Sequence, residues 1–284
     1  MKSLERKINI PIEKIKETSL STIIIFSVLY SINVIFVNFV VFRLEFLKSV
    51  ETITFGIINA TFIANLFNLI IFVSIVLMKF GRLSFSDLGI KKDKLFSALI
   101  GVITLWIIMN LVNVIIGIFK EGSLNINYIF TNYKATVILG QFIGQLLGNC
   151  LFEEIAFRGF LLVQIYKKFK NSRFKLFASI FISQMIFALI HIPNRIISGM
   201  DFNSILQSII LVFFIGVLFS IVYLATDNIF LAVGVHLLWN LPLIIVEQFA
   251  GQTIIVILIL LLSLVSNKTS GKIGIKGTDK GIKI

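Results

Sequence analysis

The chain has 284 residues, of which 57% are hydrophobic and 14% are charged, and its net charge is +12. A soluble domain has roughly 25% charged residues, so this composition excludes a water-facing surface over most of the chain and favours a helical bundle in lipid. The single cysteine, Cys150, excludes an intrachain disulfide. Because the basic residues lie in short loops between apolar segments, membrane topology explains the positive charge better than nucleic-acid binding does, and we expect no nucleic acid as a partner.

Residues 1–19 are charged and precede the first apolar segment, so they are predicted to form a cytoplasmic amphiphilic N-terminal segment rather than a cleavable signal peptide. The apolar segments that follow are each about as long as the roughly 20-residue helix that crosses a hydrocarbon core. They predict an all-α, polytopic transmembrane helical bundle over residues 20–266 with about eight membrane-spanning helices. The predicted spans are 20–42, 57–78, 96–118, 136–164, 175–192, 204–225, 229–246 and 253–266. Residues 267–284 form a basic tail that is expected to be disordered, with lysines that contact anionic membrane lipids.

The Lys and Arg residues are distributed unevenly between alternate loops. If the N-terminus is cytoplasmic, the inside segments hold 20 of the 26 basic residues, the outside loops hold five, and Arg158 lies within the fourth span. This bias predicts a multi-pass protein of the cell membrane with both termini in the cytoplasm. The Ile-, Phe-, Lys- and Asn-rich usage is typical of a bacterial gene of low GC content. The inside loop 82–90 (RLSFSDLGI) is either an amphipathic segment lying along the membrane interface or an ordinary loop.

The fourth span carries two patterns with a period of four residues. Small residues recur at Gly140, Gly144 and Gly148, a spacing that lets a second helix approach closely. A polar row runs along the same span and consists of Gln141, Gln145, Asn149 and Glu153. This row either lines a cavity or forms hydrogen bonds with neighbouring helices.

Three charged residues of the fourth span lie within one and a half turns: Glu153, Glu154 and Arg158. A charged side chain at the centre of a span costs roughly 2.5–3.5 kcal/mol, so such residues indicate a functional site. Glu154 and Arg158 are four residues apart and can neutralise each other on one helix face. Glu153 points about 100° away from Glu154 and has no partner on its own helix. An ion pair that only locks two helices would explain Glu154 and Arg158 but not Glu153.

The two histidines of the chain both lie in apolar spans. His191 ends the stretch FALIH, one turn after Phe187, and His236 opens the stretch HLLWN, one turn before Asn240. A single histidine inside a bundle is more often a hydrogen-bonded packing residue than a catalytic one. Two histidines together with an unpaired Glu153 on a third helix indicate a site, and a rise of about 1.5 Å per residue allows all three to meet near the middle of the membrane.

These three stretches resemble the motifs of the CAAX prenyl endopeptidase and bacteriocin-processing and immunity family of intramembrane proteases. The stretch EEIAFR is similar to the family's EExxxR motif, FALIH to FxxxH, and HLLWN to HxxxN, in the family's order and over roughly residues 135–245. The resemblance implies an intramembrane endopeptidase whose partner is a membrane-bound peptide or protein substrate. The catalytic residues it implies are Glu153, Glu154, Arg158, His191, His236 and Asn240. In a bacterium, maturation of a peptide or self-immunity is preferred over cleavage of a prenylated CAAX protein.

The chemistry of these residues fits peptide-bond hydrolysis in two ways. In the metal-free mechanism, which we favour, Glu153 and His191 activate a water molecule, His236 and Asn240 stabilise the oxyanion, and Glu154 and Arg158 orient these groups and balance their charge. The alternative is a divalent metal such as zinc, for which Glu153, Glu154, His191 and His236 are the candidate ligands. The sequence has no HExxH motif, which is a common zinc-binding pattern on a helix, so zinc is kept as an alternative and no cofactor is assigned.

Two other functions remain open from the sequence. The chain can be a non-catalytic immunity or resistance protein of the same fold that binds a peptide or a membrane partner. It can also be a transporter that uses Glu153 and the histidines as a proton relay, although no inverted repeat supports this. Some further residues are interpreted as packing or as helix-to-helix contacts, and these are Cys150, Ser183, Gln184 and Trp239.

Overall fold

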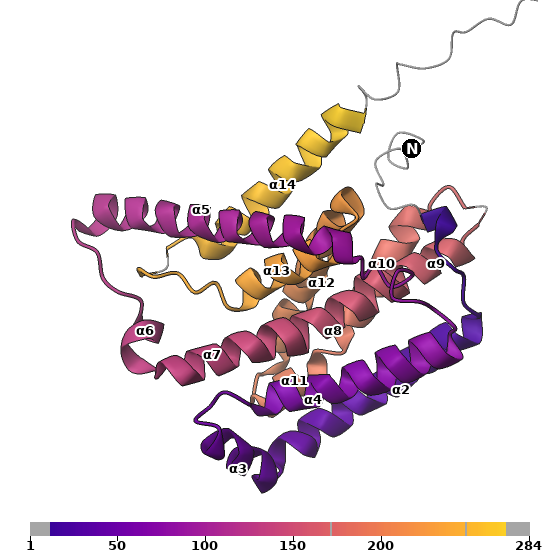
Figure 1. Ribbon diagram of the computed structural model, residues 1–284, viewed down its shortest axis with the longest axis horizontal. Coiled ribbons are helices and arrows are strands. Elements are labelled where there is room, and N and C mark those ends of the chain that lie inside the picture. The colour runs from indigo at the N-terminus through magenta and orange to yellow at the C-terminus, as the bar shows by residue number, and fades with distance from the viewer. Residues whose placement is uncertain (1–11, 171, 248, 271–284) are drawn as a thin grey trace, which may run out of the picture.

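The computed structural model describes residues 12–170, 172–247 and 249–270, with the backbone alone at residue 121 and at residues 261–270. The described chain is helical, and its extended segments form one isolated pairing, between Ile126 and Val246. The helices run side by side as a bundle (Figure 1). The prediction of an all-α fold is therefore confirmed.

In chain order, the helices are η1 (Ile12–Lys14), α2 (Leu20–Phe39), η2 (Val41–Arg43), α3 (Glu45–Ile53), α4 (Ala60–Asn68), η3 (Leu69–Phe80), η4 (Lys92–Lys94), α5 (Leu95–Glu121), α6 (Tyr128–Asn132), α7 (Ala135–Ile143), η5 (Gly144–Cys150), α8 (Leu151–Glu153), η6 (Glu154–Leu162), α9 (Val163–Lys168), α10 (Lys175–Leu189), α11 (Ile192–Ile197), α12 (Phe202–Thr226), α13 (Ile229–Asn240) and α14 (Gly251–Ser270). The segments η3, η5 and η6 are π-helical turns that continue the α-helices on either side of them.

Six helices are long and apolar enough to cross a membrane. They are Leu20–Arg43, Ala60–Phe80, Lys92–Lys120, Ala135–Lys168, Lys175–Ile197 and Phe202–Thr226. Two further apolar helices, Ile229–Asn240 and Gly251–Leu260, are shorter over the residues whose side chains are described. The expected count of about eight spans is thus not confirmed, whereas six spans are present in the described chain.

The predicted span 229–246 is shorter than expected because its helix stops at Asn240. Leu241 leaves the helical region, with φ −142° and ψ 79°. The next residue is Pro242, whose ring disfavours a helical conformation in the residue before it. The helix has 12 residues, which corresponds to about 18 Å and is less than the hydrocarbon core of roughly 30 Å.

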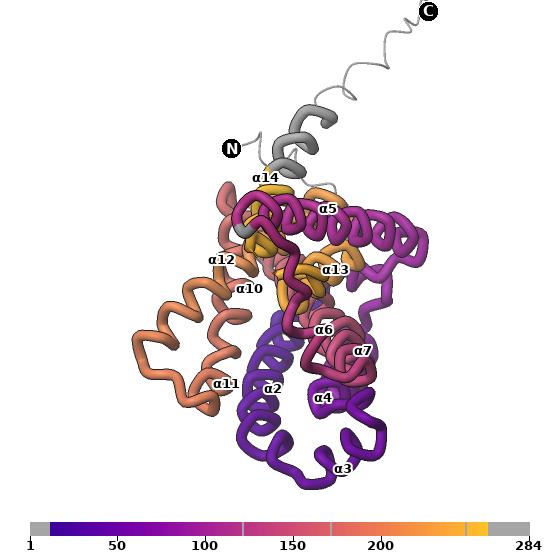
Figure 2. Tube along the Cα trace, turned by 90° about the vertical axis from the view of Figure 1, so that its left-hand side faces the viewer, coloured from indigo at the N-terminus to yellow at the C-terminus, as the bar shows by residue number. Residues whose placement is uncertain are grey.

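The helix Ala135–Lys168, which we call the central helix, lies in the middle of the bundle. In the view along the bundle, α5, α13 and α14 lie to one side of it, α2 and α4 lie to the other, and α10 to α12 stand beside them (Figure 2). Apolar side chains from both sides form the core, with Phe152, Phe157 and Phe160 of the central helix fully buried. This position surrounds Glu153 and Glu154 with protein.

The glycines of the central helix allow α4 and the turn before it to approach closely. A methyl group added at Gly140 would collide with the backbone carbonyl of Gly56, and one added at Gly144 would lie 2.7 Å from the side-chain oxygen of Asn59. At Gly148 the nearest atom, Cβ of Asn65, would be 3.4 Å away. The predicted close helix pair is present, and it brings the polar face of α4 next to Glu153.

The N-terminal segment packs against the end of the central helix. The backbone N–H of Thr18 donates to Gln164 Oε1 at 2.9 Å, and Lys167 Nζ donates to the carbonyl of Ile15 at 2.6 Å. The backbone N–H of Lys16 donates to Asp87 of loop 82–90 at 2.9 Å. Within that loop Leu88 is fully buried, so the loop is anchored in the bundle. Three of the segments predicted to be cytoplasmic therefore meet at one end of the molecule.

Two terminal predictions fall largely outside the described residues. Residues 1–11 of the predicted N-terminal segment and residues 271–284 of the predicted basic tail are not described. The start of that tail is helical, because α14 extends to Ser270. The tail prediction is therefore wrong for residues 267–270, where the apolar helix before them continues through the first turn of polar residues.

Candidate active site

The charged residues of the central helix and His236 of α13 form one buried chain of contacts. His236 Nδ1 lies 2.7 Å from Glu154 Oε1, and Arg158 Nη1 lies 2.9 Å from the same oxygen. On the other side of the imidazole, Nε2 lies 3.7 Å from Glu153 Oε2. Glu154 and Arg158 are fully buried. The helix-local ion pair expected from the sequence is formed, and a histidine 82 residues away is added to it.

Arg158 is held by more than its carboxylate partner. Its Nη2 donates to the backbone carbonyl of Gly216 at 3.3 Å, and its guanidinium lies 4.4 Å from the ring centroid of Phe187. The Nη1–H does not point at the Glu154 oxygen, so the contact between Arg158 and Glu154 is an ion pair rather than a hydrogen bond. The positive charge therefore balances Glu154 while the ring and the carbonyl fix its place.

His236 lies between the two carboxylates Glu153 and Glu154. Because the Glu154 carboxylate accepts, Nδ1–H of His236 donates to it, and the remaining ring nitrogen faces Glu153. Glu153 Oε2 is buried and has no hydrogen-bond partner among the described residues. With a proton on Nε2, the two acids Glu153 and Glu154 are balanced by two bases, Arg158 and His236, and the buried cluster is neutral.

His191 stands at the break between α10 and α11. Helix α10 ends just before it, since Pro193 occupies the first turn of α11 and cannot continue the earlier helix. The predicted span 175–192 corresponds to α10 and the turn that follows it. The Nδ1–H of His191 donates to the carbonyl of Phe187 at 2.7 Å, which leaves Nε2 of His191 with a free lone pair. The ring of Phe187 lies 4.8 Å from that of His191 and also covers Arg158, so Phe187 links the two motifs.

Asn240 is the last residue of α13. Its Nδ2 donates to Gln145 Oε1 of the central helix at 3.1 Å, and it lies 3.9 Å from the sulfur of the buried Cys150. A primary amide has two N–H groups, and the one directed at the sulfur has only a weak acceptor as its partner. The helix break before Pro242 places this carboxamide at the rim of the bundle core instead of inside a longer span.

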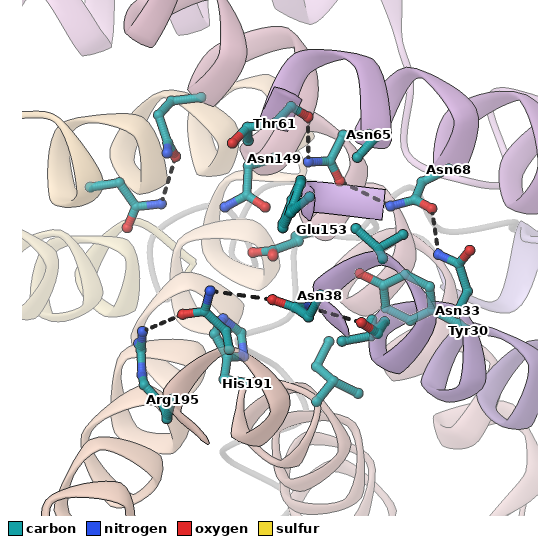
Figure 3. A pocket seen from close by; sticks show the side chains of 18 residues that line it. Tyr30, Asn33, Asn38, Thr61, Asn65, Asn68, Asn149, Glu153, His191 and Arg195 are labelled. Atoms are coloured by element: carbon teal, nitrogen blue, oxygen red, sulfur yellow. Dashed lines mark hydrogen bonds between the residues drawn. The ribbon is translucent and has the colours of Figure 1, made fainter. Parts of the chain in front are cut away.

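A cavity of about 360 Å³ joins three of the predicted site residues: Glu153, His191 and Asn240 (Figure 3). Glu154, Arg158 and His236 do not line it and lie behind Glu153. The polar row of the central helix also reaches the cavity through Gln145, Asn149 and Glu153, so its cavity-lining interpretation is the one that the geometry supports. The remaining lining residues are Tyr30, Asn33, Val34, Val37, Asn38, Phe42, Thr61, Ala64, Asn65, Asn68, Ile190, Asn194 and Arg195.

Most of those further residues were not anticipated from the sequence. Asn33 and Asn38 come from α2, Asn65 and Asn68 from α4, and Arg195 from α11. The available signal was the presence of asparagines inside apolar spans, where polar side chains are rare and face a protein interior or a water-filled space. Ser183 and Gln184 are buried away from the cavity wall, in agreement with their interpretation as helix contacts.

The candidate zinc ligands do not form a ready metal site. Within residues 12–170, 172–247 and 249–270, no three His, Cys, Asp or Glu side chains are arranged to hold a metal ion. One oxygen of Glu154 is already shared by His236 and Arg158. The donor arrangement does not fit the three protein ligands that a catalytic zinc usually takes, so no catalytic step is assigned to a metal.

Comparison with known proteins identifies one family. A family model described as Type II CAAX prenyl endopeptidase Rce1-like matches residues 135–242. This stretch runs from the start of the central helix to just beyond α13 and contains all six predicted site residues. Neither a curated protein nor a solved structure matches the chain.

Proposed function

We propose that the protein is an intramembrane endopeptidase, because residues 135–242 are similar to the Rce1-like family of type II CAAX prenyl endopeptidases. Its substrate is a membrane-associated peptide or protein, such as the precursor of a secreted peptide. The chain is a membrane protein with at least six helices able to span a bilayer. The proposal is that peptide-bond hydrolysis takes place in the cavity beside Glu153.

One observation carries this proposal above the others. Glu153 lines a polar cavity that it shares with His191, and neither of its carboxylate oxygens accepts a hydrogen bond from a described residue, Oε2 being the one that faces His236 at 3.7 Å. A buried acceptor left unpaired is costly, so it implies a ligand or a water molecule in that place. A structural ion pair does not need such a group.

The proposed reaction begins with a water molecule between Glu153 and His191. Glu153 removes a proton from the water while Nε2 of His191 accepts its other hydrogen bond and orients it. The oxygen attacks the carbonyl carbon of the scissile peptide bond, and the N–H of Asn240 that is otherwise directed at the sulfur of Cys150 donates to the oxyanion that forms. The C–N bond then breaks, and protonated Glu153 returns the proton to the leaving amine. The products are a carboxylic acid and an amine, and Glu153 is again ionised.

His236, Glu154 and Arg158 act from behind the cavity. Nε2 of His236 faces Glu153, and the pair Glu154 and Arg158 holds the imidazole from its other side. In the sequence-based mechanism His236 donates directly to the oxyanion. The position of its ring behind Glu153 instead makes it a positioning residue for that carboxylate.

The test uses the full chain reconstituted in liposomes with a pool of palmitoylated peptides of randomised sequence, read by mass spectrometry. Glu153→Gln keeps the shape of the side chain and removes its basicity, so we expect cleavage to fall by about 100-fold or more. The matched control is Glu51→Gln, which changes an exposed glutamate far from the cavity in the same way. Cleavage that survives in Glu153→Gln at the wild-type rate would refute the mechanism. Intact biological protection by that variant would favour the non-catalytic immunity function.

A further inference from the structure

The wall of the cavity opposite His191 is built from carboxamides. Asn33 Nδ2 of α2 donates to Asn68 Oδ1 of α4 at 2.8 Å, and Asn68 Nδ2 donates to Asn65 Oδ1 at 3.1 Å. Asn65 Nδ2 in turn donates to the backbone carbonyl of Thr61 at 3.0 Å. These residues form a continuous row that passes beside Glu153 (Figure 3). Together with Asn149 we call them the carboxamide strip (Asn33, Asn65, Asn68 and Asn149).

The hydrogen bonds within the strip use only part of its capacity. A primary amide has two N–H groups and two acceptor lone pairs. Asn33 Oδ1 accepts no hydrogen bond from any described residue, and the side chain of Asn149 makes none with them although it lines the cavity. Bonding between helices accounts for the contact of Asn33 with Asn68, but it does not account for Asn149 or for the unused groups of the others.

The polar residues of α4 are spaced on the same scale as the peptide groups of an extended chain. Thr61, Asn65 and Asn68 are four and three residues apart on α4, which places them about 6 and 4.5 Å apart along the helix axis. An extended chain presents its peptide groups to one side about every 6.6 Å. Asn149 lies one helical turn before Glu153 on the same face of the central helix. The strip therefore continues to the carboxylate.

A substrate cleaved inside a membrane protein needs such partners. In a helix the scissile carbonyl is occupied by an internal hydrogen bond, so the substrate has to be extended at that point. An extended backbone in a space without bulk water must find donors and acceptors in the protein. Carboxamides are chemically equivalent to peptide groups, and among the described residues that line the cavity only Glu153 and Arg195 carry charged side chains.

We propose that Asn33, Asn65, Asn68 and Asn149 bind the main chain of the substrate in an extended conformation. This inference rests on the proposed function and names its substrate class, which is a locally unfolded peptide segment recognised by its backbone. Side-chain identity beside the scissile bond contributes little, and segments that resist helix formation are preferred. The strip is thus a determinant of specificity that acts separately from the hydrolytic group.

The experiment replaces single peptide N–H groups of the substrate by ester oxygens. The probe is the best-cleaved palmitoylated peptide from the random pool, prepared with one ester at each of three positions on either side of the scissile bond. In the wild-type protein we expect at least one ester to raise KM by about three- to tenfold with little change in kcat, since one hydrogen bond is lost. The same ester is then tested in Asn65→Leu, Asn68→Leu and Asn149→Leu. The variant whose missing asparagine accepts a hydrogen bond from that substrate N–H should show the same KM for the ester peptide and for the all-amide peptide.

The quantity compared is the ratio of KM for the ester peptide to KM for the amide peptide. Both values are measured on the same protein variant, so a smaller folded fraction of that variant does not alter the ratio. Asn110→Leu serves as the control, because it also removes a buried asparagine from a span but lies on α5 outside the cavity. It should retain the wild-type ratio. Ratios near one at every position in the wild type, or ratios unchanged in all three strip variants, would overturn the role of the strip while leaving hydrolysis intact. If the wild type cleaves no peptide of the pool, the proposed function fails and the inference fails with it.

Discussion

At the scale of single residues, Arg158 is a buried charge held by an ion pair, a backbone carbonyl and an aromatic ring. Its guanidinium is fully buried, lies 2.9 Å from Glu154 and packs over the ring of Phe187. Removing one partner of a buried pair leaves an uncompensated charge, which is more damaging than removing both. The ion pair therefore makes a double substitution more informative than a single one.

We expect Arg158→Met to destabilise the protein by about 3–5 kcal/mol, because Glu154 is then buried without its balancing charge. The double variant with Glu154→Gln and Arg158→Met should recover part of that loss. Thermal unfolding of the purified protein in detergent, followed by intrinsic fluorescence, measures both. A double variant less stable than Arg158→Met alone would contradict the assigned pairing.

The same residues indicate how far a sequence can define a site. Glu154 and Arg158 were predictable as a pair because four residues on a helix always bring two side chains together. The contact of His236 with Glu154 spans 82 positions, and only the packing of α13 against the central helix creates it. The asparagines of α2 and α4 belong to no motif, so their convergence on Glu153 depends on tertiary contacts that periodicity does not encode.

At the scale of elements, the glycine face of the central helix sets the distance between α4 and Glu153. Gly140 contacts the backbone of Gly56, which cannot rotate away, whereas a methyl group at Gly148 would lie 3.4 Å from Asn65 Cβ. The sequence predicted a close helix pair but not which helix would fill it. It also placed the end of α13 beyond Asn240, because hydropathy continues through Pro242 while the hydrogen bonds of the helix do not.

We expect Gly140→Ala to destabilise the protein by about 1–3 kcal/mol, since overpacking forces the central helix away from the turn before α4. The shift moves Glu153 relative to the carboxamides of α4, so kcat should fall as well. Gly148→Ala lies on the same face of the same helix and should change both quantities far less. Thermal unfolding and peptide cleavage in liposomes compare the two variants. Equal effects of the two substitutions would contradict the close approach at Gly140.

At the scale of the whole molecule, the cavity and the basic segments occupy different ends. The hydrogen bond from Lys16 to Asp87 and that from Lys167 to Ile15 join three basic segments at one end. The cavity extends from Glu153, in the middle of the central helix, to Phe42 beyond the last turn of α2. If the basic end faces the cytoplasm, as the distribution of Lys and Arg predicts, then the cavity opens towards the opposite side of the membrane.

Labelling of introduced cysteines in intact cells tests this orientation. The native Cys150 is fully buried, and Cys150→Ala gives a background without a thiol. On that background we expect Ser123→Cys, in the exposed loop after α5, to react with a membrane-impermeant maleimide. Lys92→Cys, in the exposed turn before α5, should react only after the cells are permeabilised. The reverse pattern would place the basic end outside, and substrate would then enter the cavity from the cytoplasm. Phe42 lies at the C-terminal end of the first span and Ser123 follows the C-terminal end of the third, so both lie on the same side of the membrane.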